Sequence, residues 1–250
     1  VKNVKENGID TKYIIEDGET FTGLALIMVD EKGNNIIAVA SGADMRCCKE
    51  DVDRAEEVIK SSDILLTQLE IPLPVVECAI NEAFKDGVRV ILNPAPARKL
   101  PNELLRKVYA LTPNEKEAEM MSGVEIMNLR SAKRAAEKIL ERGVKNVVLT
   151  FGEKGSIIAT REETVHMKGI KVNAVDTTGA GDAFCGALAV AVSSGKSLKE
   201  AVKYANYAGA LATTKIGAQE ALPTKIELEK FMRARGKEVN STISRRSPLQ

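Results

Sequence analysis

Histidine and cysteine are scarce in this sequence, and each scarcity limits the kinds of catalytic and metal site that the chain can form. One of the 250 residues, His166, is a histidine, so a metal site built from several histidines is excluded. We therefore expect any catalytic base to be a carboxylate, a lysine or a tyrosine. The four cysteines form no C-x-x-C pair, which excludes a zinc knuckle and a dithiol redox motif. Unpaired thiols are typical of the reducing cytosol, so we expect a cytoplasmic protein.

The chain also lacks an excess of charge and a long apolar run. Thirty-six Lys and Arg against 35 Asp and Glu leave a formal charge of +1, so no net field attracts nucleic acid or a membrane surface. The longest strongly apolar run is 183–192, about half of the ~20 residues that span a bilayer. We therefore expect a soluble protein whose small ligand is recognised by local groups.

Hydrophobic patterning predicts an α/β fold. Apolar residues alternate from 21 to 40 around the polar segment 30–34, which predicts a β-hairpin. After Gly42 helical stretches alternate with short apolar strands, a pattern typical of a parallel sheet covered by helices. We expect helices at 49–60, 74–85 and 128–142, and strands at 64–66, 88–92, 108–111, 147–150, 156–159 and 164–167. The last third predicts three consecutive helices at 183–193, 198–213 and 224–235, followed by a frayed tail.

The segment D-T-T-G-A-G-D, residues 176–182, precedes the first of these three helices. Small residues let the backbone turn tightly, and the free N–H groups of a helix start favour an anion. No lysine follows Gly181, which excludes a Walker A loop, and the loop leads into helices rather than opening a βαβ unit, which excludes a dinucleotide fingerprint. The segment therefore predicts an anion hole, with a plain turn as the alternative.

Asp182 stands where an acceptor hydroxyl could meet a carboxylate. A helix N-terminus is expected to lower its pKa, so proton abstraction alone would not explain catalysis. In phosphoryl transfer the carboxylate can orient the hydroxyl and take its proton late. The alternative is an acid that only stabilises the helix dipole.

Five motifs together resemble the ribokinase family of sugar kinases, also called the PfkB family. They are D-T-T-G-A-G-D-A-F from 176, N-P-A-P-A at 93–97, L-T-P-N-E-K-E-A-E at 111–119, Q-L-E at 68–70 and G-A-Q at 217–219. The matches follow the order of the family from about Gly8 to Met232, and several resemble its ribokinase branch. The resemblance implies a three-layer α/β sandwich with a mainly parallel central sheet and a small β lid.

The resemblance assigns roles in binding ATP and in catalysis. It implies that Asp182 is the base and that Gly179, Ala180 and Gly181 form the anion hole. Asn114 and Glu117 match an N-x-x-E motif that organises Mg²⁺-bound water and phosphates; an exposed acid in a first helical turn is the alternative for Glu117. The turn along the nucleotide matches Thr150, Phe151, Gly152, Glu153, Lys154 and Gly155, for which a tight hairpin turn is the alternative. Asn206 matches a position near the adenine, unless it is a solvated helix-face residue.

The resemblance also implies a sugar contact, a monovalent cation and a partner subunit. Glu70 matches an acid that accepts a hydrogen bond from the sugar, with an ordinary strand-end acid as the alternative. A potassium ion is expected at the positions of Asp176, Thr178, Ala212, Lys215, Gly217 and Ala221. Ala221 departs from the serine common there, which affects cation affinity or selectivity. The lid is expected to pair with the lid of a second copy in a homodimer.

Two sugar-binding motifs of the family, N-x-D and G-G-K-G-A-N, do not occur in this sequence. We therefore expect either a fragment of a longer polypeptide or a natural truncation. The expected parts are the end of a core helix at 1–12, part of the lid at 13–42, a nucleotide-binding core at 43–236 and a disordered tail at 237–250. The expected function is phosphorylation of D-ribose by ATP to D-ribose 5-phosphate. The alternatives are a fructokinase, a 2-keto-3-deoxygluconate kinase or a non-catalytic remnant.

Overall fold

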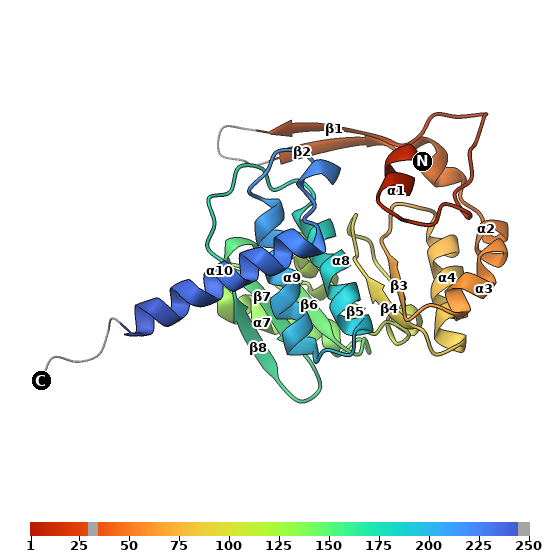
Figure 1. Ribbon diagram of the computed structural model, residues 1–250. Coiled ribbons are helices and arrows are strands. Elements are labelled where there is room, and N and C mark those ends of the chain that lie inside the picture. Colours follow the sequence, from red (N-terminus) through yellow and green to blue (C-terminus); the bar gives the residue numbers. More distant parts are fainter. Residues whose placement is uncertain (30–34, 245–250) are drawn as a thin grey trace, which may run out of the picture. The chain divides into compact units, whose positions relative to one another are not determined.

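The computed structural model describes residues 1–29 and 35–244, with side chains described for residues 1–28 and 38–235. The described chain divides into two units, whose helices and strands are labelled in Figure 1. The first contains residues 1–28, 36–150 and 157–165, and the second contains chiefly 151–156 and 166–244.

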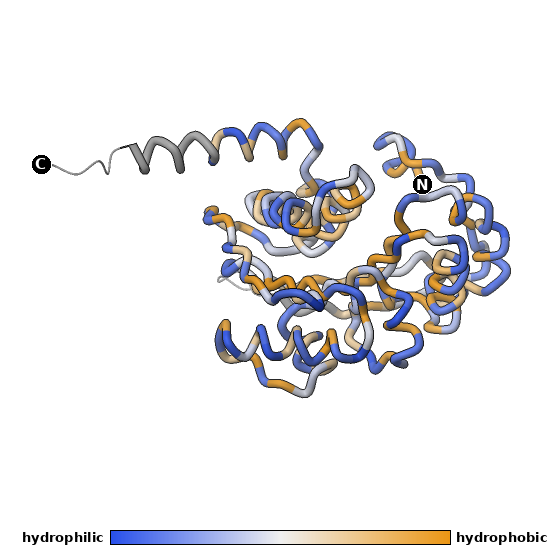
Figure 2. The backbone as a smooth tube through the Cα atoms, turned by 90° about the horizontal axis from the view of Figure 1, so that it is seen from below, coloured by the Kyte–Doolittle hydropathy of each residue, from blue (hydrophilic) through white to orange (hydrophobic). Residues whose placement is uncertain are grey.

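A six-stranded sheet in the order β3-β4-β5-β6-β7-β8 organises the described α/β region. Its strands are β3 (Ile64–Thr67), β4 (Arg89–Leu92), β5 (Ala110–Leu111), β6 (Val147–Thr150), β7 (Gly155–Ala159) and β8 (Thr164–Lys168). The first four pair in parallel, with Thr67 opposite Leu92 and Leu92 opposite Leu111. Parallel strands covered by helices are expected to be apolar throughout, and β4 and β6 each contain three buried apolar residues; Figure 2 colours the backbone by hydropathy. All six predicted strands are confirmed, with ends that shift by one or two residues.

The helices that precede β6 in the chain belong to the first unit. They are α1 (Lys2–Glu6), α2 (Lys49–Arg54), α3 (Glu56–Lys60), α4 (Leu73–Lys85), α5 (Asn102–Leu105), α6 (Glu115–Ser122) and α7 (Leu129–Leu140), with a 3-10 turn η1 (Gly42–Arg46). α4 contacts β3 and β4, while α6 and α7 contact β6. The single helix predicted at 49–60 is wrong, because the backbone breaks at Ala55. α1 lies within 1–12, where the end of a core helix is expected, whereas the short helices α5 and α6 are absent from the list of expected helices.

β1 (Leu24–Val29) and β2 (Asn35–Ala40) form a separate two-stranded sheet, as the alternation at 21–40 predicted. The turn predicted at 30–34 lies outside the described residues. Leu24, Leu26 and Met28 share one face of β1, because side chains alternate along a strand, and each is more than half exposed. This sheet therefore presents an apolar face to solvent in the single chain.

The second unit is built mainly from α8 (Ala180–Ser193), α9 (Leu198–Ala212) and α10 (Lys225–Ser244), with 3-10 turns η2 (Gly152–Lys154) and η3 (Gln219–Ala221). α8 and α9 pack along their lengths, and α10 packs on α9. Gly209 allows the close approach, because a Cβ there would lie 3.2 Å from the Ala180 carbonyl oxygen. Tyr207 and Phe231 meet edge to face with centroids 5.9 Å apart.

The last helix of the described chain is longer than the sequence pattern predicts. The last helix extends to Ser244, so its predicted end at Arg235 is wrong. Residues 245–250 lie outside the described residues, and the disordered tail stays a prediction. Within the described part of the chain, no helix combines the length and the apolarity needed to cross a membrane.

Candidate functional site

Loops that follow four neighbouring parallel strands lie along one edge of the sheet. The Leu69 amide donates to the Ala95 carbonyl oxygen at 2.8 Å, after β3 and β4. The Asn93 side-chain Nδ2 donates to the Thr112 carbonyl oxygen at 2.8 Å, after β4 and β5. The amide of Thr150, the last residue of β6, donates at 2.9 Å to the carbonyl oxygen of Pro113, which follows β5. The motifs at 68–70, 93–97 and 111–119 therefore meet at the carboxyl edge of the sheet, where α/β folds bind ligands.

Glu70 is exposed at this edge. Its neighbour Leu69 is fully buried, so a core side chain and a backbone hydrogen bond anchor the segment that carries the acid. This placement agrees both with a sugar-binding carboxylate and with an ordinary strand-end acid.

Asn114 and Glu117 form the N-terminal capping box of α6. The Asn114 Oδ1 accepts from the Glu117 amide at 2.9 Å, while the Asn114 amide and Nδ2 donate to the two Glu117 carboxylate oxygens, each at 2.8 Å. Glu117 is 6% exposed, so the alternative of an exposed acid is wrong. Burial raises the pKa of Glu117, and the hydrogen bond from the Asn114 amide opposes that shift.

The capping box also limits how these residues could hold Mg²⁺. Among the described residues, no group of three or more His, Cys, Asp and Glu side chains is placed to hold a metal ion. Each carboxylate oxygen can accept more than one hydrogen bond, so Glu117 can cap α6 and still accept from a metal-bound water. Mg²⁺ keeps several waters and needs few protein ligands. The arrangement fits a magnesium ion held through water and phosphate oxygens, and does not fit one chelated directly.

The segment 150–155 forms a tight 3-10 turn between β6 and β7. The Phe151 amide donates to the Gly155 carbonyl oxygen at 2.7 Å, and Phe151 is buried. The Lys154 Nζ lies 4.4 Å from the centroid of the Phe151 ring. Gly155 has φ +97°, and a Cβ there would overlap the backbone of Met167. The protein's own backbone therefore requires this glycine, and the predicted contact with nucleotide stays a prediction.

Asn206 lies on α9 and points into the protein. Its Nδ2 donates to the hydroxyl of Ser156 at 3.0 Å, and Ser156 is fully buried at the start of β7. Asn206 is only partly exposed, so it is not a freely solvated helix-face residue. The contact joins α9 to the strand that follows η2.

The glycine loop before α8 has the tight geometry that its composition predicts. Gly179 is the N-cap residue with φ +74°, and a Cβ there would lie 3.2 Å from the Ala218 carbonyl oxygen. The Ala180 amide donates to the Thr177 carbonyl oxygen at 3.3 Å, so this member of the predicted anion hole is already engaged. The Gly181 amide has no acceptor in the described part of the chain, and the space beside its Cα is open. Gly181 is therefore placed to donate to an anion, and the Gly179 amide likewise has no acceptor among the described residues.

Asp182 is the third residue of α8, and the residue as a whole is exposed although neighbouring atoms cover part of its carboxyl group. Partial burial of the carboxyl by its surroundings raises its pKa, and a hydrogen bond from its own amide opposes that shift. This direction is opposite to the one expected from the helix N-terminus, because desolvation of the carboxyl outweighs the hydrogen bond from the Asp182 amide. A carboxylate with a raised pKa is a better base than an unperturbed aspartate.

The loop 176–179 rests on residues that follow α9. The Asp176 carboxylate accepts from the Thr178 amide at 2.9 Å and from the Gly217 amide at 3.0 Å. The Thr213 carbonyl oxygen accepts from the Val175 amide at 2.7 Å. These bonds bring Asp176, Thr178 and Gly217 together, as the cation prediction requires.

The other predicted cation positions lie on the same segment. Ala212 and Ala221 are fully buried, while the Lys215 side chain turns to Glu227 on α10, with Nζ 2.9 Å from Oε1. The Thr178 hydroxyl oxygen is buried and has no hydrogen-bond partner within the described residues. A buried hydroxyl oxygen that accepts no hydrogen bond is suited to act as a cation ligand.

Sequence reasoning missed Glu227, although T-x-x-E at 224–227 is a capping-box signal.

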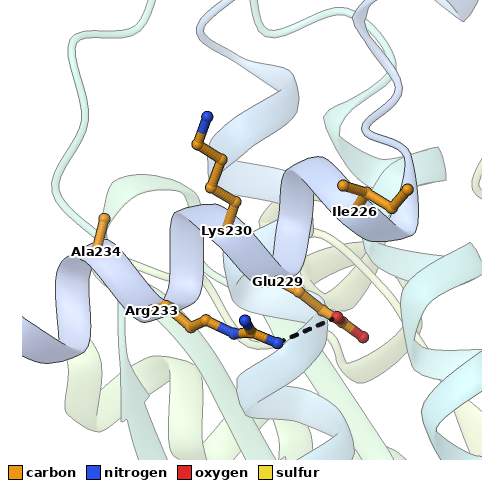
Figure 3. Close-up of a pocket in the computed structure, with 5 residues that line it drawn as sticks. All are labelled: Ile226, Glu229, Lys230, Arg233 and Ala234. Atoms are coloured by element: carbon orange, nitrogen blue, oxygen red, sulfur yellow. Dashed lines mark ion pairs between the residues drawn. The ribbon is translucent and has the colours of Figure 1, made fainter.

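A surface hollow on α10 is lined by Ile226, Glu229, Lys230, Arg233 and Ala234 (Figure 3). Arg233 Nη2 lies 3.7 Å from Glu229 Oε2 across it. All five residues belong to one helix, and none is a predicted site residue. The hollow is therefore a groove of a single helix surface and not the candidate site.

Comparison with known proteins gives one consistent result. Residues 1–225 match the family described as pfkB family carbohydrate kinase. A ribokinase from Staphylococcus aureus (strain COL) is 41% identical over 224 residues, which cover 89% of this chain and 74% of that protein.

Solved structures give the same result for the fold. A ribokinase from Thermotoga maritima is 39% identical and superposes with a TM-score of 0.81, covering 93% of this chain and 75% of that one. An Arabidopsis thaliana ribokinase, solved with ribose and ATP, is 31% identical with a TM-score of 0.81, covering 90% and 74%. These similarities confirm the α/β fold class with a mainly parallel sheet.

Proposed function

Because the chain belongs to the pfkB family of carbohydrate kinases, we propose that it transfers the γ-phosphoryl group of ATP to the primary hydroxyl of D-ribose. The products are D-ribose 5-phosphate and ADP. The identity of 41% to a ribokinase and the ribose and ATP held by the Arabidopsis relative support this choice of substrates.

The α8 N-terminus carries the proposed chemistry. In a loose transition state the transferred phosphoryl group spreads its charge over three oxygens, so preorganised donors lower the barrier. The open amide of Gly181, at the first turn of α8, is suited to donate to such an oxygen. Asp182, the next residue along α8, orients the ribose hydroxyl and accepts its proton as the new P–O bond forms. Its raised pKa supports this role.

ATP binding is assigned to the segments that the family motifs mark. In this proposal the 150–155 turn lies along the nucleotide and Asn206 lies near the adenine. Mg²⁺, when bound, neutralises charge on the phosphates. Glu117 then accepts from a magnesium-bound water, and Asn114 holds the carboxylate through two hydrogen bonds. Glu70 accepts a hydrogen bond from a ribose hydroxyl at the carboxyl edge of the sheet.

Besides Mg²⁺, the proposed site binds a potassium ion beside the glycine loop. Asp176, Thr178, Ala212, Lys215, Gly217 and Ala221 are the positions assigned to it, most through backbone carbonyls. The buried Thr178 hydroxyl oxygen without a described partner supports the assignment. Ala221 has no hydroxyl to offer, so we expect weaker or less selective cation binding than in relatives with serine.

The apolar face of β1 and β2 supports a homodimer through the lid. Isolated two-stranded sheets are marginal in water, and the exposed face of Leu24, Leu26 and Met28 would gain by burial against a second copy. Sedimentation velocity tests this: the wild-type protein should sediment as a dimer, and Leu26→Lys should shift it to a monomer. A monomeric wild type would remove the dimer from the proposal.

The observation that carries the proposed function is the placement of Asp182 beside an open amide on a glycine-capped helix start. A coupled ADP-release assay with ribose, fructose, 2-keto-3-deoxygluconate and adenosine tests it. Ribose should give the highest kcat/KM. A better rate with another acceptor would assign the chain to a different branch of the family. Nucleotide binding with no transfer to any acceptor would favour the non-catalytic alternative.

A further inference from the structure

The Glu227 carboxylate, at the start of α10, accepts hydrogen bonds from two different residues, Thr224 and Lys215. Its Oε2 accepts from the Thr224 amide at 2.8 Å and from the Thr224 hydroxyl at 2.9 Å, while its own amide donates to that hydroxyl at 3.3 Å. This capping box fixes the carboxylate to the helix. The second oxygen, Oε1, accepts from the Lys215 Nζ at 2.9 Å. A carboxylate held by its own helix is therefore a rigid anchor for Lys215.

Lys215 belongs to the segment 213–221, here named the support loop, on which the glycine loop is built. Thr213 accepts from the Val175 and Asp176 amides, at 2.7 and 3.2 Å. Gly217 donates to the Asp176 carboxylate at 3.0 Å. The Ala218 carbonyl oxygen would lie 3.2 Å from a Cβ at Gly179. A shift of the support loop would therefore move the backbone that leads into α8.

The hydrogen bond between Lys215 and Glu227 joins the support loop to the first turn of α10. The pair is partly exposed, with side-chain exposures of 39% for Lys215 and 45% for Glu227. Such a pair contributes little to global stability, so a role for it must lie in placing the loop.

We propose that Glu227 is a positioning residue for phosphoryl transfer: through Lys215 it holds the support loop, and through that loop it sets the backbone of residues 176–181. The inference rests on the proposed function for its effect on catalysis. It assigns to the first turn of α10 a part in the site that the family motifs do not mark. Glu227 touches neither substrate nor reacting atoms, so its effect passes through Lys215 and the support loop.

Hydrogen–deuterium exchange tests the positioning without any catalytic readout. In Glu227→Gln the amides of Thr178 and Gly217, which both donate to Asp176, should exchange roughly 2- to 30-fold faster, the range expected for coupled elements. Glu229→Gln is the matched control, because it removes the Arg233 pair on the same helix (Figure 3) and leaves the support loop untouched. Unchanged exchange in Glu227→Gln would overturn the proposal.

Lys215→Met separates the ion pair from the helix cap. This variant leaves the Thr224 capping box intact, so it should reproduce the faster exchange of Glu227→Gln if the anchor acts through Lys215. Exchange that rises in Glu227→Gln alone would attribute the effect to fraying of α10 and overturn the proposal.

Kinetics then test the link to the reaction. In both variants the KM for ATP and the potassium concentration for half-activation should rise, with a smaller change in kcat and a melting temperature close to that of the wild type. A uniform loss of kcat that parallels a lower melting temperature would indicate a merely structural role and contradict the proposal. If the wild-type protein phosphorylates no sugar, the proposed function fails while the exchange data still decide the positioning.

Discussion

Replacing Asp182 by asparagine tests the proposed chemistry with a nearly isosteric change. Asp182 is the third residue of α8, and partial desolvation raises the pKa of its carboxyl group. Asparagine keeps the size of the side chain but cannot accept a proton. Loss of a general base costs about 100- to 10,000-fold in rate. At about 1.4 kcal/mol per factor of ten, this corresponds to about 3–5 kcal/mol of transition-state stabilisation.

The same substitution should hardly change stability. A negative charge in the first turn of a helix contributes about 0.3–1 kcal/mol, and relief of the partial burial of the charge offsets part of that loss. For a chain of this size the melting temperature should therefore shift by less than about 4 °C. Affinity for ATP should change little, because the Gly181 amide stays in place.

The assay compares kcat for ADP release in the wild type, Asp182→Asn and Glu200→Gln. Glu200 is the matched control, since it is also the third residue of a helix, α9, and its carboxylate accepts hydrogen bonds from Ser197 in the capping box of that helix. Because the base must be ionised, wild-type kcat should fall as pH drops through the raised pKa of Asp182. Asp182→Asn should lack that acid limb. A rate within tenfold of wild type would refute the assignment of Asp182 as the base.

Three further predictions concern the residues around the site. Glu117→Gln leaves one of the two Asn114 donors without an acceptor, so the free energy of unfolding at neutral pH should fall by about 1–3 kcal/mol in urea titrations. Burial raises the pKa of Glu117, so the wild-type protein gains stability as pH falls through the folded pKa of this carboxyl. Glu117→Gln lacks that titration, so the difference in unfolding free energy between variant and wild type should change over the same pH range. A difference that does not depend on pH would contradict the raised pKa. Gly155→Ala should lower the melting temperature far more than Gly195→Ala in calorimetry, because both residues have positive φ but only Gly155 meets other backbone; equal losses would argue against the clash. Ala221→Ser should lower the potassium concentration needed for half-activation. This concentration is measured by ADP release as a potassium salt is titrated into potassium-free buffer. An unchanged value would remove Ala221 from the cation site.

Much of the fold could be predicted because its signals are local. Alternation along 21–40 and the apolar runs at 64–66, 88–92 and 147–150 reflect which side chains face water, a property of neighbouring residues. Short elements were missed or merged for the opposite reason. α6 has few apolar residues, and its start depends on the Asn114 capping box, while the break at Ala55 leaves no mark in a charged amphipathic pattern.

The candidate site divides in the same way. The turn at Gly179 and the helix behind it follow from small residues that adopt a positive φ and from the apolar run after them, so the segment 176–182 predicts an anion-binding loop without further information. The direction of the Asp182 pKa, the burial of Glu117 and the pairing of Lys215 with Glu227 do not follow from spacing. They depend on desolvation and on contacts between segments that are distant in the chain. Such contacts exist only once helices and loops pack, because burial and electrostatic interactions act through space and not along the sequence.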